Sequence, residues 1–371
     1  MRKNSTYSYD SPLLMLVIGL VAFGTVELYS ASSPQTIYGS NTHFLLRHLF
    51  WVVLGSGSFI FFSTFNYKKL NNWAFVLIIC SIIIVILGYV FSPEGEQSRW
   101  LIYTSSGNKI TTSDFARFAL IIFTASFLDK TKNLGEFKTI LPYLTITGFM
   151  VVLVAFQRDF STAGIMAVWI FTILFIAGVK LSQLLTLAGS ITPFAILYLV
   201  GYQKERISAW INSDKFSTTA NWQSGNSQMA LGSAGWFGKG IGDSEIKQGL
   251  LPQAHTDFIF SVIGEEVGFI VLILILIAFF WLFYRGIKIA KHTPDAFGMY
   301  LSIGIVLYIM LYFLINVGYV TGLLPTTGLP MPFFSYGGTN TVITMSILGI
   351  LLNISRYSNS KLSKHHGRVY A

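Results

Sequence analysis

Residues 251–284 read LPQAHTDFIFSVIGEEVGFIVLILILIAFFWLFY, and this stretch decides the fold. From residue 259 onward it is almost continuously apolar and longer than the roughly 20 residues that cross the hydrocarbon core of a bilayer. Asp257 stands where the polar sequence before it gives way to this apolar segment. A carboxylate at that boundary sits near the lipid headgroups, which is costly, so Asp257 is a candidate functional residue.

The composition of the whole chain supports a membrane protein. Charged residues make up 11% of the 371 residues, against about 25% in soluble domains, and the mean hydropathy is +0.61. Cys80 is the single cysteine, which excludes an intrachain disulfide, and the six histidines lack the paired spacing of a zinc site. The net charge of +9 is distributed in a way that indicates membrane topology and not nucleic-acid binding.

Apolar segments recur along the chain, and we expect ten of them to cross the membrane as helices. The predicted fold is therefore an all-α polytopic membrane protein, with residues 1–371 forming one ten-span domain. The expected spans are 12–31, 44–65, 72–91, 114–128, 140–156, 163–179, 183–201, 259–284, 298–318 and 337–355.

The distribution of lysine and arginine predicts the orientation. With the N-terminus in the cytoplasm, the inner segments hold fifteen of these residues and the outer segments eight. Both termini are then cytoplasmic. The larger loops lie outside, at 92–113 and at 202–258, and the second of these separates spans seven and eight. Loops of that length in a compact membrane protein are usually functional.

Two interpretations of Asp257 follow from its position. Thr256 or Asp257 could cap the N-terminus of the helix that begins near residue 259, by accepting backbone N–H bonds. Alternatively, Asp257 could act as a general base that faces a polar cleft. The two roles are compatible, because a helix N-terminus also favours a carboxylate.

Further charges occur inside the predicted spans. Glu265 and Glu266 lie roughly 12 Å below Asp257 on the same helix, and two adjacent acids cannot both face lipid. Asp114 and Arg117 are three residues apart and so share a helix face. We expect a buried ion-pair network of Asp114, Arg117 and Glu265 that fixes the packing of the two helices.

The outer ends of the spans hold other polar candidates. Asp159 lies in FQRDFSTAG (residues 156–164), where Asp159 or Ser161 could cap the next helix or line a cavity. Glycines punctuate GSAGWFGKGIGDS (residues 232–244), which lacks the spacing of a phosphate loop. This segment indicates tight turns, or exposed amides near a pyrophosphate. Arg99, Trp100 and Arg206 complete the outer candidates.

The loop GYVTGLLPTTGLPMPFFSYGGTN (residues 318–340) contains three prolines that prevent a continuous helix. Broken backbone at membrane depth is tolerated only against protein or beside a water-filled cavity. We therefore expect this loop, with Ser335, to face the same cavity as Asp257.

Several of these motifs together resemble the SEDS family, which includes FtsW and RodA. They are SRW at 98–100, QRDFSTA at 157–163, WQSGNSQMALGSAGWFGKGIG at 222–242, LPQAHTDFIFSVIGEE at 251–266 and LPTTGLPMPFFSYGG at 324–338. The resemblance covers nearly all ten expected spans in the same order, and the IGEE form favours the FtsW branch.

The resemblance implies a peptidoglycan glycosyltransferase of the bacterial cytoplasmic membrane. Such an enzyme polymerises lipid II at the outer face, for division or elongation, with a class B penicillin-binding protein as partner. It implies that Asp257 is catalytic. It implies no nucleotide cofactor and no nucleic-acid partner.

The implied reaction suits the candidate residues. The sugar hydroxyl that attacks needs a base, for which Asp257 is placed, and a single displacement inverts the anomeric carbon. The undecaprenyl-pyrophosphate leaving group needs positive charge. A divalent cation (Mg²⁺ or Mn²⁺) held by Asp257 could supply that charge, as could side chains, and we expect Asp159, Trp100 and Ser335 to contact substrate as well. The basic candidates are Arg206, Lys239, Lys247 and Arg99.

Two other functions are compatible with the same features. A lipid II flippase would also use many spans, intramembrane charges and broken helices. The candidate groups crowd the outer half, however, whereas flipping needs a polar path through both leaflets. The third possibility is a non-catalytic scaffold for a penicillin-binding protein.

Overall fold

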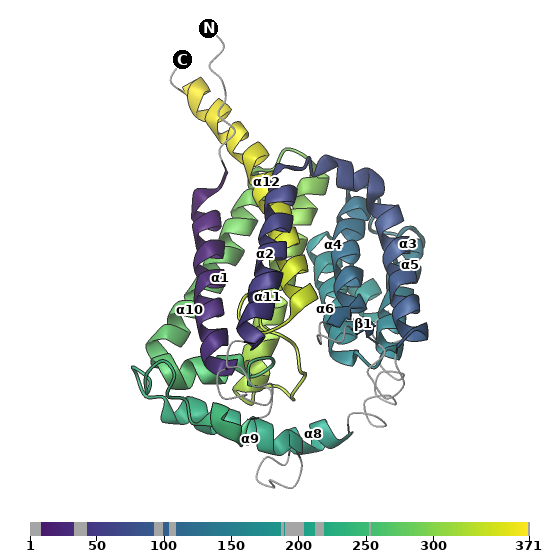
Figure 1. The fold of residues 1–371 in the computed structure, drawn as a ribbon. Coiled ribbons are helices and arrows are strands. Elements are labelled where there is room, and N and C mark those ends of the chain that lie inside the picture. Colours follow the sequence, from purple (N-terminus) through teal and green to yellow (C-terminus); the bar gives the residue numbers. More distant parts are fainter. Residues whose placement is uncertain are drawn as a thin grey trace.

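A computed structural model of the chain describes residues 9–32, 43–92, 99–103, 109–186, 189, 204–211, 219–251 and 254–369. The described residues form a helical bundle with one small hairpin (Figure 1). The elements are α1 (Ser11–Ser32), α2 (His43–Thr64), α3 (Lys68–Val90), β1 (Trp100–Tyr103), β2 (Lys109–Thr111), α4 (Thr112–Lys130), α5 (Phe137–Phe156), α6 (Phe160–Ile176), α8 (Lys204–Ile211), α9 (Thr219–Ser233), the π-helix η2 (Ile246–Leu250), α10 (Ile259–His292), α11 (Ala296–Val320) and α12 (Gly338–Val369).

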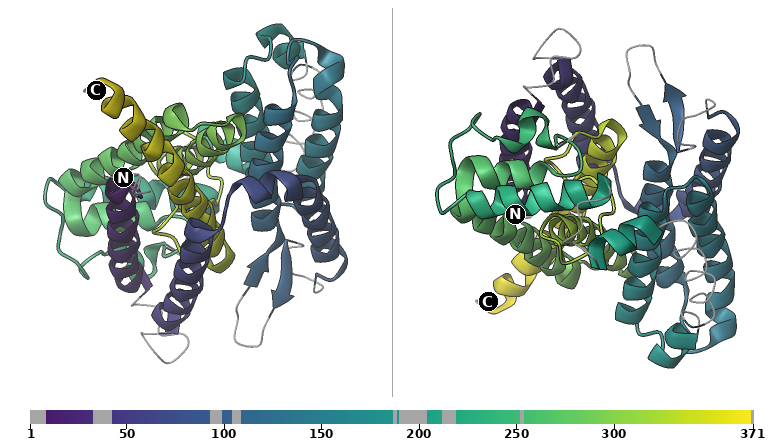
Figure 2. Two further views of the ribbon diagram at one scale, coloured as in Figure 1. Left: turned by 90° about the horizontal axis from the view of Figure 1, so that it is seen from above. Right: turned by 90° about the horizontal axis from the view of Figure 1, so that it is seen from below.

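The helices stand side by side in two groups. Seen along the bundle, α1, α2, α10, α11 and α12 form one group and α3 to α6 the other (Figure 2). Helices α11 and α12 join them, because both pack against α4. Helix α1 begins and α12 ends at the same end of the bundle, while α8 and α9 lie across the opposite end (Figure 1). We call this opposite end the site end, because Asp257 lies there.

Seven of the described helices are long and apolar enough to cross a membrane: α1, α2, α3, α5, α10, α11 and α12. Two more expected spans are also helical. Helix α6 is apolar but only 17 residues long. Helix α4 carries Asp114 and Arg117 yet is buried along most of its length, so its charges face protein and not lipid. Most of the expected span 183–201 lies outside the described residues.

The expectation of an all-α chain needs one correction. Strands β1 and β2 form an antiparallel hairpin between α3 and α4, with Trp100 opposite Thr111 and Tyr103 opposite Lys109. The hairpin falls within the predicted outer loop 92–113. Water or protein at the membrane surface can satisfy its unpaired edges, which the hydrocarbon core could not do.

Helices α11 and α12 form the centre of the bundle. Over its most apolar 18 residues α12 is 83% buried and α11 67%, whereas α2 is only 22% buried. The outer helices therefore present their apolar side chains to the surrounding lipid. The central helices instead carry polar side chains that find partners inside the protein, among them Asn316, Asn340 and Asn353.

The segment between α11 and α12, residues 321–337, dips back into the bundle. Met331 and Phe334 are fully buried, and the Phe334 ring contacts Phe23 of α1 edge-on at 5.9 Å. At Gly24 an added Cβ would lie 2.3 Å from the carbonyl oxygen of Phe333, so only glycine admits the loop there. Gly24 comes 14 residues after Asp10, which immediately precedes α1, so it lies about 21 Å along the helix from that end of the bundle. Non-helical backbone at this depth is tolerated because protein surrounds it.

Candidate active site

Asp257 lies in the turn 254–258 that leads into α10 at the site end of the bundle, and it is half-buried. The N-cap position of α10 is Phe258, which makes no side-chain capping hydrogen bond. Thr256 and Asp257 precede this position, and the capping role predicted for them stays a prediction. A Cβ added at Gly328 would stand 3.3 Å from Asp257 Oδ2. The carboxylate therefore lies directly against the backbone of the loop 321–337, as the sequence predicted for the loop of three prolines.

Two side chains of α11 tie the Asp257 turn to that loop. Asn316 Nδ2 donates to the carbonyl oxygens of Asp257 (3.1 Å) and Leu329 (2.8 Å). The Tyr319 hydroxyl lies 2.6 Å and 2.9 Å from the same two oxygens. Both side chains are fully buried. The turn and the loop are thus held together from inside the bundle.

His255 closes another side of the turn. Its carbonyl oxygen accepts the Tyr336 N–H at 2.9 Å, and its ring packs against Phe44 of α2 and against Tyr336. Burial disfavours the charged imidazolium and lowers the pKa of His255 to about 4. His255 is therefore neutral at physiological pH, and its role here is to pack against the neighbouring aromatic rings.

The junction between α5 and α6 reaches the same loop from the other group of helices. The Ser161 hydroxyl donates to the Thr327 carbonyl oxygen at 2.6 Å. Asp159 caps α6 by accepting the Thr162 N–H at 3.4 Å, and it also accepts the Ser113 hydroxyl at 2.8 Å. The side chain of Asp159 is 3% exposed. Of the two roles predicted for Asp159, capping is confirmed, and its oxygens already have partners within the protein.

A half-exposed basic cluster lies beside this junction. Arg99 Nη1 stands 3.7 Å from Asp159 Oδ1. Two cations contact the Trp100 ring, the Arg99 guanidinium at 5.3 Å and Lys109 Nζ at 3.5 Å from its centroid. Arg99 is 30% exposed, so its group can meet both Asp159 and an anion from outside. The substrate contacts predicted for Arg99 and Trp100 stay predictions, and Lys109 joins them as a cation that the sequence reasoning did not single out.

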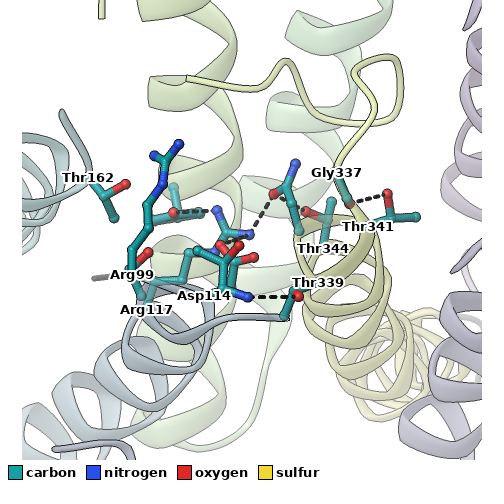
Figure 3. Close-up of polar contacts among 12 residues, drawn as sticks. Arg99, Asp114, Arg117, Thr162, Gly337, Thr339, Thr341 and Thr344 are labelled. Carbon is teal, nitrogen blue, oxygen red and sulfur yellow. Dashed lines mark hydrogen bonds and ion pairs between the residues drawn. The ribbon is translucent and has the colours of Figure 1, made fainter. Parts of the chain in front are cut away.

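Arg117 is the centre of a buried polar network between α4, α11 and α12 (Figure 3). It pairs with Asp114 at 3.0 Å, and it donates to Tyr308 Oη at 3.1 Å and to Asn340 Oδ1 at 2.5 Å. The predicted Asp114–Arg117 pair is confirmed. The predicted third member, Glu265, is not in this network, because α4 packs against α11 and α12 while Glu265 faces the residues that follow α9.

Both glutamates of α10 pair with lysines of the predicted outer loop. Lys239 lies 2.8 Å from Glu265 and 3.0 Å from Glu245. Lys247 lies 2.7 Å from Glu266, and the side chains of both are buried. Two of the cations expected to meet a pyrophosphate are thus engaged by carboxylates. Lys247 is buried with its carboxylate partner, and the two carboxylates around Lys239 leave it little charge to offer, so both pyrophosphate contacts stay predictions.

The glycine-rich segment supplies hydrogen-bond partners for backbone groups of α10 at a break in that helix. Gly268 has non-helical torsion angles (φ 85°, ψ 175°). The carbonyl oxygens of Glu265 and Glu266, which the break releases, accept the N–H groups of Lys239 and Gly240 at 2.9 Å each. Below the break, the N–H groups of Phe269 and Ile270 donate to Gly235 and Trp236. Of the two predicted roles, turns are present, and the Lys239 and Gly240 amides are not free for a pyrophosphate.

Two predicted substrate contacts remain. Ser335 is 2% exposed and its hydroxyl accepts the Met331 N–H at 2.7 Å, so it stabilises the loop, and its substrate contact stays a prediction. Arg206 falls on α8, but its side chain lies outside the described residues.

An apolar groove of about 680 Å³ lies next to the site, between α9, α10 and α11. Phe260, one turn from Asp257, lines it, and the groove continues along α10 to Leu276. Its lining suits an alkyl or prenyl chain or an apolar helix and does not suit a sugar.

Whether a divalent cation fits this site depends on the oxygen ligands available at and around Asp257. Among the described ranges, no group of three histidine, cysteine or acidic side chains could hold a metal ion. The Asp257 and Leu329 carbonyl oxygens are already taken by Asn316 and Tyr319. What fits is therefore a cation held by one carboxylate and by phosphate oxygens of a substrate, as is usual for Mg²⁺.

Sequence reasoning missed Asn316 and Tyr319. One signal was available, because an asparagine within an apolar span is costly unless it has partners. The spacing of three residues puts both side chains on one face of α11, but their target could not be known without the packing.

Comparison with known proteins adds independent findings. The model of the FtsW/RodA/SpoVE family, described as cell cycle protein, matches residues 11–360. The chain is 36% identical over 356 residues to the probable peptidoglycan glycosyltransferase FtsW of Trichlorobacter lovleyi, covering 94% of this chain and 93% of that protein. It is 32% identical over 361 residues to the stage V sporulation protein E of Bacillus subtilis, covering 95% and 98%.

Solved structures agree in fold. A chain from a study of polymerization and crosslinking by a peptidoglycan synthase complex superposes with a TM-score of 0.77 at 24% identity, covering 95% of this chain and 98% of that one. The rod shape determining protein RodA of Thermus thermophilus superposes with a TM-score of 0.70 at 23% identity, covering 94% and 97%.

Proposed function

Because the chain belongs to the FtsW/RodA/SpoVE family, we propose that it is a peptidoglycan glycosyltransferase in which Asp257 is the general base. It polymerises lipid II into glycan strands at the outer face of the bacterial cytoplasmic membrane. The relatives named FtsW favour a role in cell division.

One observation carries the assignment of Asp257. Its half-buried carboxylate lies at the site end of the bundle, against Gly328 of the loop 321–337, and the α5–α6 junction reaches that loop through Ser161 and Thr327. Elements from both groups of helices thus converge where a lipid-linked sugar at the headgroup level would lie. The side chains of Glu265, Glu266 and Asp159 are engaged by basic or hydroxyl partners within the bundle, so these three carboxylates serve the packing of the fold.

The reaction requires a proton acceptor and a stabilised leaving group. Asp257 takes the proton of the acceptor sugar hydroxyl as its oxygen attacks the anomeric carbon of the donor. The bond to the undecaprenyl pyrophosphate breaks in the same displacement, and the configuration at the anomeric carbon inverts. No covalent glycosyl-enzyme intermediate is required.

Positive charge for the pyrophosphate comes from the basic cluster of Arg99 and Lys109 beside Trp100. Arg206 is a further candidate on α8. A divalent cation, Mg²⁺ or Mn²⁺, bound by Asp257 and the substrate phosphates would neutralise the leaving group further. The apolar groove along α10 offers a surface for the lipid tail.

The membrane topology of the proposal has ten spans with both termini in the cytoplasm. Helix α6 would cross about 25 Å with its 17 residues, and α4 is shielded from lipid by α3, α11 and α12. The tenth span is the one expected from the sequence at 183–201, most of which lies outside the described residues. This arrangement puts Asp257 and the loop 202–258 on the outer face.

A class B penicillin-binding protein is the proposed partner, since a chain of similar fold comes from a peptidoglycan synthase complex. A flippase would need polar groups along a path through both leaflets. Polar groups of the site gather at one end of the bundle, which favours the enzyme over the flippase.

The test is polymerisation of labelled lipid II by the purified protein with its partner. Asp257→Asn keeps the size of the side chain and removes its basicity, so polymer formation should fall at least about 100-fold. The control is Asp243→Asn, which removes one charge from an exposed residue of the same loop region. Equal rates for wild type and Asp257→Asn would refute the assignment. Transfer of labelled lipid across sealed vesicles without polymer would support the flippase.

A further inference from the structure

Two backbone carbonyl oxygens converge beside the catalytic turn. Asp257 O and Leu329 O both lie within 3.1 Å of Asn316 Nδ2 and within 2.9 Å of the Tyr319 hydroxyl oxygen. Carbonyl oxygens carry partial negative charge and repel one another when they share a site. Their approach therefore depends on donor hydrogens placed between them.

The donor hydrogens and the acceptors balance. The Asn316 amide supplies two hydrogens and the Tyr319 hydroxyl supplies one. The acceptors are the two carbonyl oxygens and the Tyr319 oxygen, which lies 2.7 Å from Asn316 Nδ2. Asn316 Oδ1 is buried and has no hydrogen-bond partner among the residues that the structure describes. Turning the amide around would point this oxygen at two other oxygens, so the acceptors fix its orientation.

We propose that Asn316 and Tyr319 are positioning residues for Asp257, through the two carbonyl oxygens that they hold together. This inference rests on the proposed function of Asp257. By joining the turn 254–258 to Leu329, the pair sets the place of the neighbouring Gly328 backbone against Asp257 Oδ2. Both side chains are buried, and their hydrogen bonds run to the backbone carbonyl of Asp257.

The count of donor hydrogens predicts a larger loss of kcat in Asn316→Asp than in Tyr319→Phe. In Tyr319→Phe the two Asn316 hydrogens can still serve one carbonyl oxygen each, so the turn shifts slightly and kcat falls about tenfold. In Asn316→Asp the amide nitrogen and its two donor hydrogens are replaced by one carboxylate oxygen, which faces the two carbonyl oxygens. The turn and the loop then separate, and kcat falls about 100-fold or more, as expected for a displacement of about 1 Å.

The kinetic test uses the enzyme with its partner and labelled lipid II, and compares kcat with KM. A positioning role lowers kcat while KM for lipid II and the midpoint of thermal unfolding in detergent stay near the wild-type values. The control is Tyr143→Phe, which removes another buried hydroxyl hydrogen bond, 2.9 Å to Thr124, in the other group of helices. That variant should keep the wild-type kcat. Wild-type kcat in both Tyr319→Phe and Asn316→Asp would overturn the proposal.

A second measurement does not depend on activity. Amide hydrogen exchange over residues 254–258 and 328–331 should rise in Tyr319→Phe, and more in Asn316→Asp, while Tyr143→Phe leaves both segments protected. Unchanged exchange in folded Tyr319→Phe protein would overturn the proposal even if Asn316→Asp failed to fold. If Asp257→Asn still polymerises, the proposed catalytic role fails, and the exchange data still decide whether the pair holds the turn.

Discussion

The break in α10 at Gly268 gives the sharpest prediction about stability. A Cβ at this position would lie 2.4 Å from Gly238 N and 2.5 Å from both Phe237 C and Trp236 O. All three are backbone atoms, so no side-chain rotation can relieve the overlap. Ordinary contact begins at 3.4 Å, and Gly268→Ala therefore forces the loop away from the helix by about 1 Å.

The cost follows from what that displacement breaks. Four backbone hydrogen bonds of 2.9 to 3.3 Å join residues 235–240 to residues 265–270, and each contributes about 0.5 to 1.5 kcal/mol net. The torsion angles of Gly268 (φ 85°, ψ 175°) lie in a region that is essentially restricted to glycine, which adds about 1 to 3 kcal/mol. We expect Gly268→Ala to destabilise the fold by about 3 to 9 kcal/mol.

The assay is the midpoint of thermal unfolding in detergent, together with the folded fraction on size-exclusion chromatography. Gly232→Ala is the matched control, because Gly232 lies within α9 with no atom within 4 Å of an added Cβ, and alanine there should stabilise by about 0.5 to 1 kcal/mol. Equal unfolding midpoints for Gly268→Ala and Gly232→Ala would refute the reasoning.

Three further predictions concern buried side chains that are charged or can become charged. Arg117→Ala should lower folded yield in detergent more than Arg206→Ala, because it leaves Asp114 buried without its partner; equal yields would contradict this. Lys247→Met should cost about 3 to 5 kcal/mol by leaving Glu266 uncompensated, and adding Glu266→Gln should recover most of the lost thermal stability. The lowered pKa of His255, about 4 against 6.5, means that the unfolded chain takes up a proton first as the pH falls. Stability should therefore drop by up to about 3 kcal/mol between pH 6.5 and pH 4, and a scan of unfolding midpoints should show a smaller drop for His255→Phe.

Helix periodicity and membrane thickness made part of the protein predictable. The apolar length of segments such as 259–284 predicted helices that cross the membrane, and seven of the described helices are long and apolar enough to do so. The Asp114–Arg117 pair followed from the three-residue spacing. The place of Asp257 beside the proline-containing loop followed from the rule that broken backbone needs protein or water around it.

Which side chains of distant segments contact each other was decided only by the packing of the helices and loops. Glu265 and Glu266 could be assigned a depth from the rise per residue, but their direction depends on which segment covers α10. That segment is the glycine-rich loop, whose lysines and amides both turn inward. Lys247, which was expected to contact a pyrophosphate, is part of a buried ion pair. Lys239, for which the same contact was expected, has most of its charge compensated by two carboxylates.

The sequence by itself therefore determined that this is a polytopic membrane protein with a carboxylate at one membrane boundary, because those features depend on local composition and helix geometry. The tertiary structure decided what holds the turn that carries this carboxylate. Asn316 and Tyr319 reach Asp257 across 59 and 62 residues of chain, and no periodicity in the sequence relates them. Contacts of that kind exist only once the helices have packed, because they arise from the direction in which each helix turns its polar face.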